Sequence, residues 1–144
     1  MTKDELNLLI KTLHKISFFS GFSNADIDML IEKFHKCTFP KGKIVIRENE
    51  QGEGFFVISK GKVEVAKKES LLKRKHLAIL SSGGYFGEVS LISNEPTMAT
   101  VKAIEYTEAF VLSRFEFQQI LRQNPSLAER IKSIAESRKF KSKF

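Results

Sequence analysis

The chain has 144 residues, of which 42% are hydrophobic and 28% charged, and this composition is typical of one globular domain that buries a core. A single cysteine, Cys37, excludes an internal disulfide and a cysteine-based metal cluster, and no apolar run approaches the roughly 20 residues that a membrane-spanning helix needs. The N-terminus lacks the apolar stretch of a secretory signal, so we expect a cytoplasmic protein, and the net charge of +7 is concentrated toward the C-terminus.

Two helices are predicted within residues 1–35. The segment "DELNLLIKTLHKI" carries apolar residues at helical spacing, and these are Leu6, Leu9, Ile10, Leu13 and Ile16. After the interruption "SFFSGF", Ser23 and Asp26 have the spacing of a capping box before the apolar segment "IDMLIEKF". The first part of the chain is therefore predicted to be a pair of helices.

The pattern changes to short strands over residues 36–112. Apolar and β-branched segments such as "IVIR", "FFVIS", "KVEVAKK" and "HLAIL" are separated by turns that contain glycine. A charged hairpin tip is predicted near "SLLKRK", between two of these segments. Many short strands at regular spacing are typical of an antiparallel sandwich or barrel.

Residues 113–144 are predicted to be helical again. Ser113 and Glu116 have the spacing of a capping box before "FQQILRQ", and the proline of "NPS" ends that helix. Ser126 and Glu129 repeat the spacing and predict the start of a final helix, "LAERIKSIAESRKF".

The end of the chain is basic, with Glu136 as the one acid after position 129. The bases are Arg130, Lys132, Arg138, Lys139, Lys141 and Lys143. Such a tail is typical of a solvated face or a partner-docking end, although it can also attract nucleic acid or acidic lipid without sequence specificity.

The stretch "YFGEVSLI" has features of a small-ligand site. It is long enough for a short helix, with apolar Phe86, Val89 and Ile92 three residues apart. The free N–H groups of a helix's first turn can bind an anion, and Gly87 allows another group to approach the backbone closely. Glu88 can accept hydrogen bonds from hydroxyl groups such as those of a sugar.

At this point the chain resembles the cyclic nucleotide-binding domain family over nearly its whole length. The segment "FPKGKIVIRENEQGEGFFVISKGKVEV" is similar to the family's first strands, with Gly42, Gly52 and Gly61 at turn positions, and "FGEVSLISNEPTMATVKA" is similar to its phosphate-binding cassette.

The resemblance implies a mainly β, α+β fold: an antiparallel double-stranded β-helix or jelly-roll β-barrel flanked by N-terminal and C-terminal helices. It implies a single domain over 1–144, with helices in 1–35, the β-roll in 36–112, the cassette in 85–99, and C-terminal helices with a lid in 113–144.

The resemblance also implies a binding site. The backbone of Gly87, Glu88, Val89 and Ser90 would face the cyclic phosphate of cAMP or cGMP, and Glu88 would bind the ribose 2′-hydroxyl. Met98 would lie near the base, and Ala99 fits the family pattern. The final helix would close as a lid, with Ile131, Ile134 and Arg138 as contacts.

Thr97 departs from the family, which has a phosphate-binding arginine after the proline. Burying a phosphate anion without a cation is costly, and threonine offers one hydrogen bond where a bidentate arginine offers two and a charge. We expect Thr97 to weaken cyclic nucleotide binding by at least about tenfold, and up to about a thousandfold, unless another base reaches the site. The candidate bases are Arg47, Lys73, Arg74, Lys75 and Arg138.

Purely structural roles, which need no ligand, stay open beside these binding roles. Glu88 either contacts a ligand or caps its own helix, and Met98 either contacts a base or fills the core. Thr97 could serve only to join a turn to a strand, and the lid helix could pack on the roll without a ligand.

The predicted function is that of a non-enzymatic regulatory module that binds a cyclic nucleotide and signals through a separate protein partner. The alternative is a ligand-free interaction scaffold that has lost nucleotide binding. Three scattered histidines do not favour a cupin-type metal site. No helix-turn-helix follows the lid, so specific DNA binding is not expected, and the resemblance leaves a homodimer through the final helix open.

Overall fold

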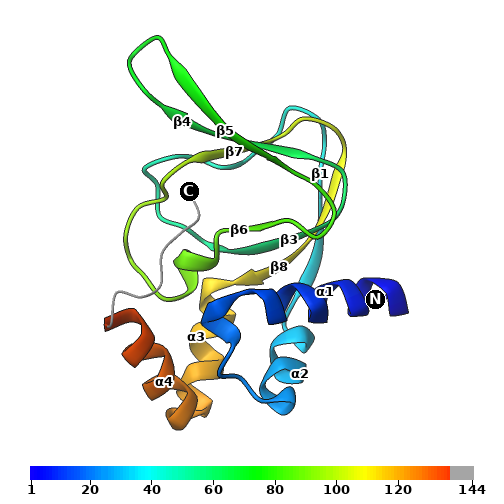
Figure 1. Ribbon diagram of the computed structural model, residues 1–144, viewed down its shortest axis with the longest axis vertical. Helices are drawn as coiled ribbons and strands as arrows, with labels where there is room; N and C mark the ends of the chain where they lie inside the picture. Colours follow the sequence, from blue (N-terminus) through cyan, green and yellow to red (C-terminus); the bar gives the residue numbers. More distant parts are fainter. Residues whose placement is uncertain (137–144) are drawn as a thin grey trace.

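The computed structural model describes residues 1–136, and their elements follow the predicted order of helices, strands and helices (Figure 1). The helices are α1 (Lys3–Lys15), η1 (Ser17–Phe19), α2 (Asn24–Glu32), η2 (Glu88–Leu91), α3 (Arg114–Gln123) and α4 (Pro125–Glu136). The strands are β1 (His35–Phe39), β2 (Ile44–Ile46), β3 (Gly54–Lys60), β4 (Val63–Lys68), β5 (Arg74–Leu80), β6 (Tyr85–Phe86), β7 (Thr100–Ala103) and β8 (Thr107–Ser113).

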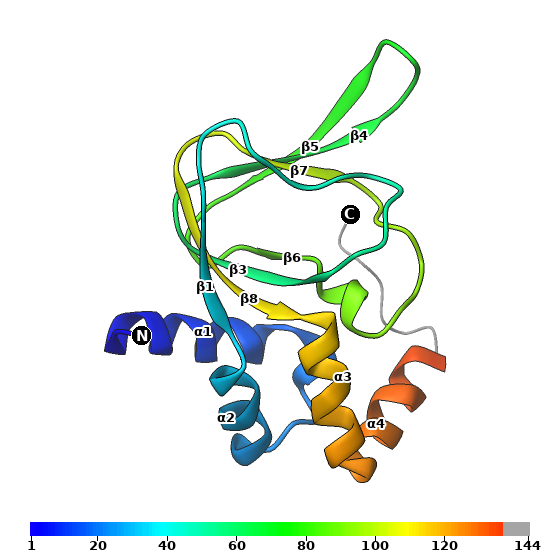
Figure 2. The same cartoon turned by 180° about the vertical axis from the view of Figure 1, so that it is seen from behind.

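Two antiparallel sheets face each other and form the roll (Figure 2). One has the strand order β1-β8-β3-β6 and the other β2-β7-β4-β5. The mainly β fold with flanking helices is therefore confirmed. Within the described residues each sheet is hydrogen-bonded only within itself, so a closed barrel is not seen, and the double-stranded β-helix stays a prediction.

The helix starts follow local hydrogen-bonding rules, with one correction. The Ser23–Asp26 capping box of α2 is present as predicted. At α3 one of the two capping-box hydrogen bonds is present, in which the Ser113 hydroxyl accepts from the Glu116 N–H. The prediction that Ser126 opens the last helix was wrong, because α4 begins at Pro125. Proline suits the first helical position, where its missing N–H would have no intrahelical partner.

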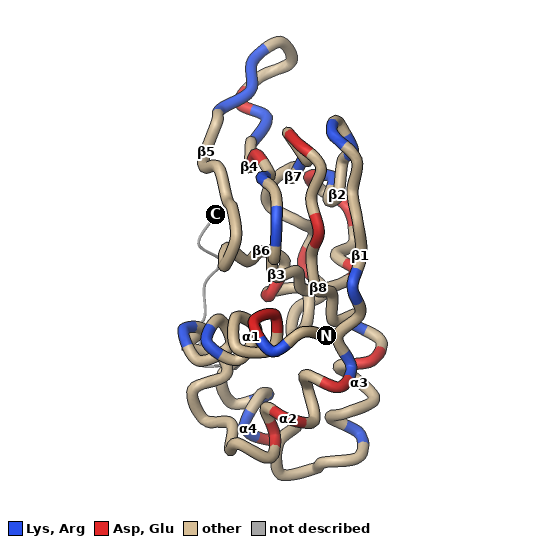
Figure 3. Tube along the Cα trace, turned by 90° about the vertical axis from the view of Figure 1, so that its right-hand side faces the viewer, with Lys and Arg blue, Asp and Glu red and all other residues tan. Residues whose placement is uncertain are grey.

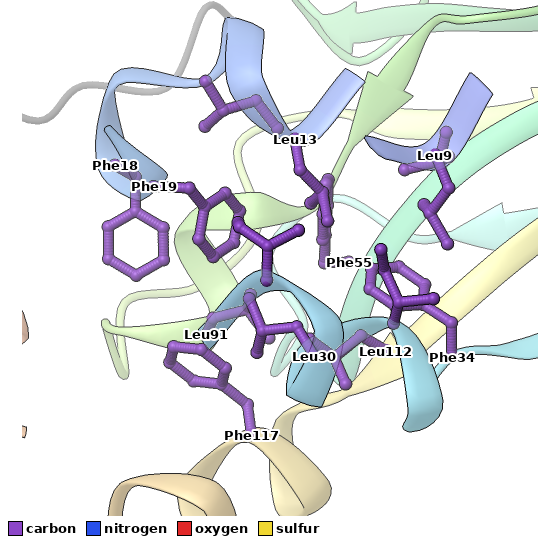
Figure 4. Packing of buried hydrophobic residues seen from close by; sticks show 14 of the residues in the cluster. Leu9, Leu13, Phe18, Phe19, Leu30, Phe34, Phe55, Leu91, Leu112 and Phe117 are labelled. Atoms are coloured by element: carbon purple, nitrogen blue, oxygen red, sulfur yellow. The ribbon is translucent and has the colours of Figure 1, made fainter. Parts of the chain in front are cut away.

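A phenylalanine-rich core joins the helices to one face of the β1-β8-β3-β6 sheet (Figure 4). Phe18, Phe19, Phe55 and Phe117 are its largest fully buried side chains. Their rings meet edge-on or tilted, as between Phe18 and Phe19, whose centroids are 4.7 Å apart. This core fixes the helices against the sheet and includes Leu91 of η2.

A smaller apolar cluster fills the space between the sheets. Along β3 the side chains alternate, so Phe55 and Val57 join the helical core while Phe56 and Ile58 pack inside the roll. Phe56 stacks on Phe86 of β6 with centroids 4.8 Å apart. Four members of this cluster also line a cavity beside η2, and these are Val65, Phe86, Ala99 and Val101.

Candidate functional site

Gly87 forms the tight turn that leads from β6 into the short helix of the predicted cassette. It lies between β6 and η2 with φ +83°, in the left-handed region that favours glycine. A Cβ at this position would lie 2.3 Å from the carbonyl oxygen of Gly54 on β3. Only a glycine can therefore make this turn while the cassette backbone packs closely on β3.

A cavity of about 430 Å³ opens beside η2, within the size range of small-molecule sites. It is lined by Ile46, Val65, Phe86, Gly87, Glu88, Val89, Ser90, Glu95, Pro96, Thr97, Met98, Ala99 and Val101. All seven residues that the sequence assigned to the binding site line this one cavity. The additional apolar lining comes from β2, β4, β6 and β7, so both sheets contribute to the walls.

Two polar cassette residues are buried in the wall of the cavity. The exposed fraction is 4% for Glu88 and 8% for Ser90. Burial raises the pKa of the neighbouring Tyr85 hydroxyl, and the charge of Glu88 raises it further. Acidic side chains are seldom buried in proteins, so a buried Glu88 in a cavity wall is a candidate for ligand recognition.

Thr97 uses its hydroxyl to hold a neighbouring loop. The hydroxyl donates to the Arg47 carbonyl and accepts from the Glu50 N–H at 3.2 Å. Backbone hydrogen bonds add to this contact, because Thr97 N–H donates to the Glu50 carbonyl and Asn49 N–H to the Thr97 carbonyl, each at 2.9 Å. In this arrangement the single hydroxyl proton of Thr97 is already donated within the protein.

The cavity lining contains two carboxyl groups, those of Glu88 and Glu95, and no lysine or arginine among the described residues. Arg47 and Arg74 line a second groove of about 310 Å³, together with Lys68. That groove lies on the other face of the β2-β7-β4-β5 sheet. Along β7, for example, Val101 faces the cavity and the adjacent Thr100 faces the groove.

The remaining candidate bases also lie away from the cavity lining or beyond the described part of the chain. Lys73 and Lys75 lie on the hairpin between β4 and β5, where Lys73 pairs with Glu69 at 3.8 Å. Arg138 lies outside the described residues. No base predicted to replace the arginine therefore lines the cavity in residues 1–136.

Two of the three predicted lid residues pack away from the cavity, and the third, Arg138, lies outside the described residues. Ile131 is buried in the helical core and Ile134 packs against that core, so neither lines the cavity. Arg130 of α4 donates to the Gly21 carbonyl and pairs with Asp26 of α2. A ligand contact of the lid stays a prediction.

The sequence reasoning missed two features of the site. Glu95 lines the cavity, and its position just before the cassette proline was an available signal. Gly52 packs against the cassette so closely that an added Cβ would lie 2.7 Å from the Ser90 Cβ. Nothing local in the sequence pointed to that second contact.

The sequence matches the family described as "Cyclic nucleotide-binding domain" over residues 36–124. It is 26% identical over 116 residues to the cyclic AMP receptor protein of Thermus thermophilus, covering 81% of this chain and 54% of that protein. It is 32% identical over 124 residues to a cGMP-dependent protein kinase of Plasmodium berghei, covering 83% of this chain and 14% of the kinase. The chain thus spans about half or less of these relatives.

Solved structures give the same family likeness. A structure described as cAMP-bound PfPKA-R has a TM-score of 0.76 at 26% identity, over 83% of this chain and 43% of that one. The regulatory subunit of a cAMP-independent protein kinase A from Trypanosoma brucei has a TM-score of 0.63 at 27% identity, over 86% of this chain and 46% of that one. In the described residues, no helix has the length and apolar character needed to cross a membrane.

Proposed function

The chain belongs to the cyclic nucleotide-binding domain family, whose members are regulatory sensors rather than enzymes, and we propose that its cavity is a regulatory ligand site with weakened phosphate recognition. One observation carries this proposal: within residues 1–136 the cavity lining offers no cation to a phosphate, and the hydroxyl at the arginine position already donates to the Arg47 carbonyl.

The electrostatics of the lining support weak binding of a cyclic phosphate. A cyclic phosphate carries one negative charge, and Glu88 and Glu95 bring two acidic groups to the same cavity. The N–H groups at a helix start contribute only about 0.3–2 kcal/mol toward an anion, which is less than the several kcal/mol that desolvation of a charge costs. The deficit corresponds to an affinity loss of at least about tenfold, up to about a thousandfold.

Other features of the cavity suit a ligand with hydroxyl groups and an apolar or aromatic part. Glu88 offers acceptor oxygens to hydroxyl groups, and Ile46, Val65 and Val101 offer an apolar wall. Met98 is 49% exposed and lines the same cavity, which leaves space beside it for a ring. cAMP and cGMP are the ligands to test first, and the bound state would signal through a separate protein partner.

Calorimetric titration with cAMP and cGMP tests the proposal, using the natural chain, Thr97→Arg and Thr97→Gln. Both variants lose the hydroxyl bonds to the loop at Arg47 and Glu50, but only arginine adds a charge. We expect Thr97→Arg to bind at least about tenfold more tightly than the natural chain, and Thr97→Gln to show no such gain.

Each other outcome has a definite meaning. Tight binding by the natural chain with no gain in Thr97→Arg would contradict the weakened phosphate site. If all three proteins stay folded by circular dichroism and none binds, the ligand-free scaffold becomes the better description of the chain.

A further inference from the structure

The hairpin between β4 and β5 extends away from the rest of the molecule, at the end opposite to the helices (Figures 1 and 2). Residues 67–75, called the hairpin tip below, end in a tight turn in which Ser70 and Lys73 exchange backbone hydrogen bonds at 3.1 and 3.4 Å. Leu71 and Leu72 occupy the two central positions, where they are 89% and 100% exposed. Two large apolar side chains thus lie at the outermost point of the hairpin.

Turn chemistry does not explain these leucines. Central turn positions favour glycine, asparagine, aspartate, proline or serine, because those residues provide positive φ angles or local hydrogen bonds. Neither leucine has a positive φ, so the backbone here accepts ordinary residues. Because both side chains remain in water, folding gains no apolar burial from them, and a contact outside the domain is required to bury them.

The hairpin tip is strongly basic, with five lysine or arginine residues and one acid. The register places Lys67 opposite Lys75 and Lys68 opposite Arg74, and like charges directly opposite each other destabilise a sheet. Glu69 is the one acid in the tip, and it pairs with Lys73 at 3.8 Å. Figure 3 shows these basic residues along the projecting hairpin. An anionic surface next to the tip would attract this cluster of bases.

We propose that the hairpin tip docks on an anionic lipid surface. Leu71 and Leu72 enter the boundary between headgroups and acyl chains, and the five bases on the strands and turn contact lipid phosphates. The two features need each other, because two leucines alone bind a bilayer weakly and a basic segment alone stays at its surface. Nucleic acid fits less well, because it stacks on aromatic rings and offers no apolar layer to aliphatic side chains.

The docked orientation leaves the rest of the domain accessible. The helices lie at the far end of the molecule from the hairpin tip, and the cavity is lined by residues outside the tip (Figure 1). Lipid docking is therefore independent of the proposed cavity ligand.

Vesicle flotation tests the proposal with phosphatidylcholine alone and with phosphatidylcholine containing phosphatidylserine. The full chain is compared with Leu71→Ser/Leu72→Ser and with Phe115→Ser, which removes an apolar side chain that is 62% exposed on α3. We expect binding only to vesicles with phosphatidylserine, an affinity loss of at least about tenfold in the leucine variant, and no change in the Phe115 variant. Equal binding by the leucine variant, or no binding by the natural chain, would overturn the proposal.

A fluorescent reporter measures insertion directly. The chain contains no tryptophan, so Leu72→Trp gives a single indole at the turn. We expect its emission to shift to the blue and to be quenched by brominated acyl chains only when phosphatidylserine is present. An unchanged spectrum with phosphatidylserine vesicles would overturn the insertion of the tip. A blue shift on a DNA duplex but not on those vesicles would assign the tip to nucleic acid instead.

Discussion

Replacing Gly52 with alanine is expected to push the cassette away from the loop that packs on it. The added Cβ would lie 1.8 Å from the Ser90 hydroxyl oxygen and 2.7 Å from the Ser90 Cβ. The hydroxyl can rotate away, but the Cβ is fixed by the backbone of η2. The distance between the two Cβ atoms therefore has to grow from 2.7 Å to the 3.4 Å of an ordinary contact.

The cost follows from the rigidity of both segments. Overpacking of this kind costs about 1–3 kcal/mol, and we expect about 2 kcal/mol here because Gly52 is buried. For a chain of this size that loss lowers the melting temperature by roughly 6–8 °C. Thermal and urea unfolding followed by circular dichroism measure it, since the chain has no tryptophan.

A second substitution isolates the contact. Ser90→Gly removes both Ser90 atoms that the new Cβ meets, at a cost of about 0.5–1 kcal/mol for glycine in a helix. The double variant Gly52→Ala/Ser90→Gly should therefore be more stable than Gly52→Ala by at least about 1 kcal/mol. Strictly additive losses, or a Gly52→Ala protein as stable as the natural chain, would refute this account of the packing.

Three further perturbations follow from the structure. Gly87→Ala should cost at least about 2 kcal/mol more than Gly42→Ala, because both have positive φ but only Gly87 has a carbonyl oxygen 2.3 Å from the new Cβ; equal urea midpoints would contradict this. The Thr2 N–H, followed by the Lys36 ammonium, lowers the pKa of Glu5 from 4.5 to about 2, so its stabilising effect is complete above pH 4.5 and lost as the pH falls through 2. Glu5→Gln should therefore melt below the natural chain near neutral pH and match it near pH 2, whereas a constant difference would exclude the linkage. Ile131→Ala should lower the free energy of unfolding by about 2–5 kcal/mol, because its side chain is 97% buried in the helical core; a loss below about 1 kcal/mol would place it outside that core.

Local patterns in the sequence were sufficient for the first two helices, and the resemblance to a known family gave the position of the cassette. The Ser23–Asp26 capping box depends on residues three apart, and apolar spacing identified α1. The cassette is also continuous in sequence, so the two predicted segments, 87–90 and 97–99, line one cavity. Features of this kind require no knowledge of distant contacts.

Contacts between distant segments could not be predicted in the same way. Thr97 and Arg47 are 50 positions apart, so the hydrogen bond that occupies the threonine hydroxyl has no local signal. Arg47 directly follows β2, in which the register shifts between Ile44 and Ile46. This shift decides on which face of the sheet the Arg47 side chain lies. For Ile131, the helical pattern indicated an apolar face but not whether core or ligand covers it.

The position of Leu91 links the cavity to the helices in thermodynamic terms. Leu91 is 2% exposed in the core that Phe18 and Phe117 share (Figure 4). Glu88 and Ser90 of the same short helix line the cavity. A ligand that displaces η2 therefore has to disturb or improve the packing of the helices. A partner that holds those helices in one arrangement therefore changes the affinity of the cavity for its ligand. By thermodynamic reciprocity, the ligand changes the affinity for that partner by the same factor.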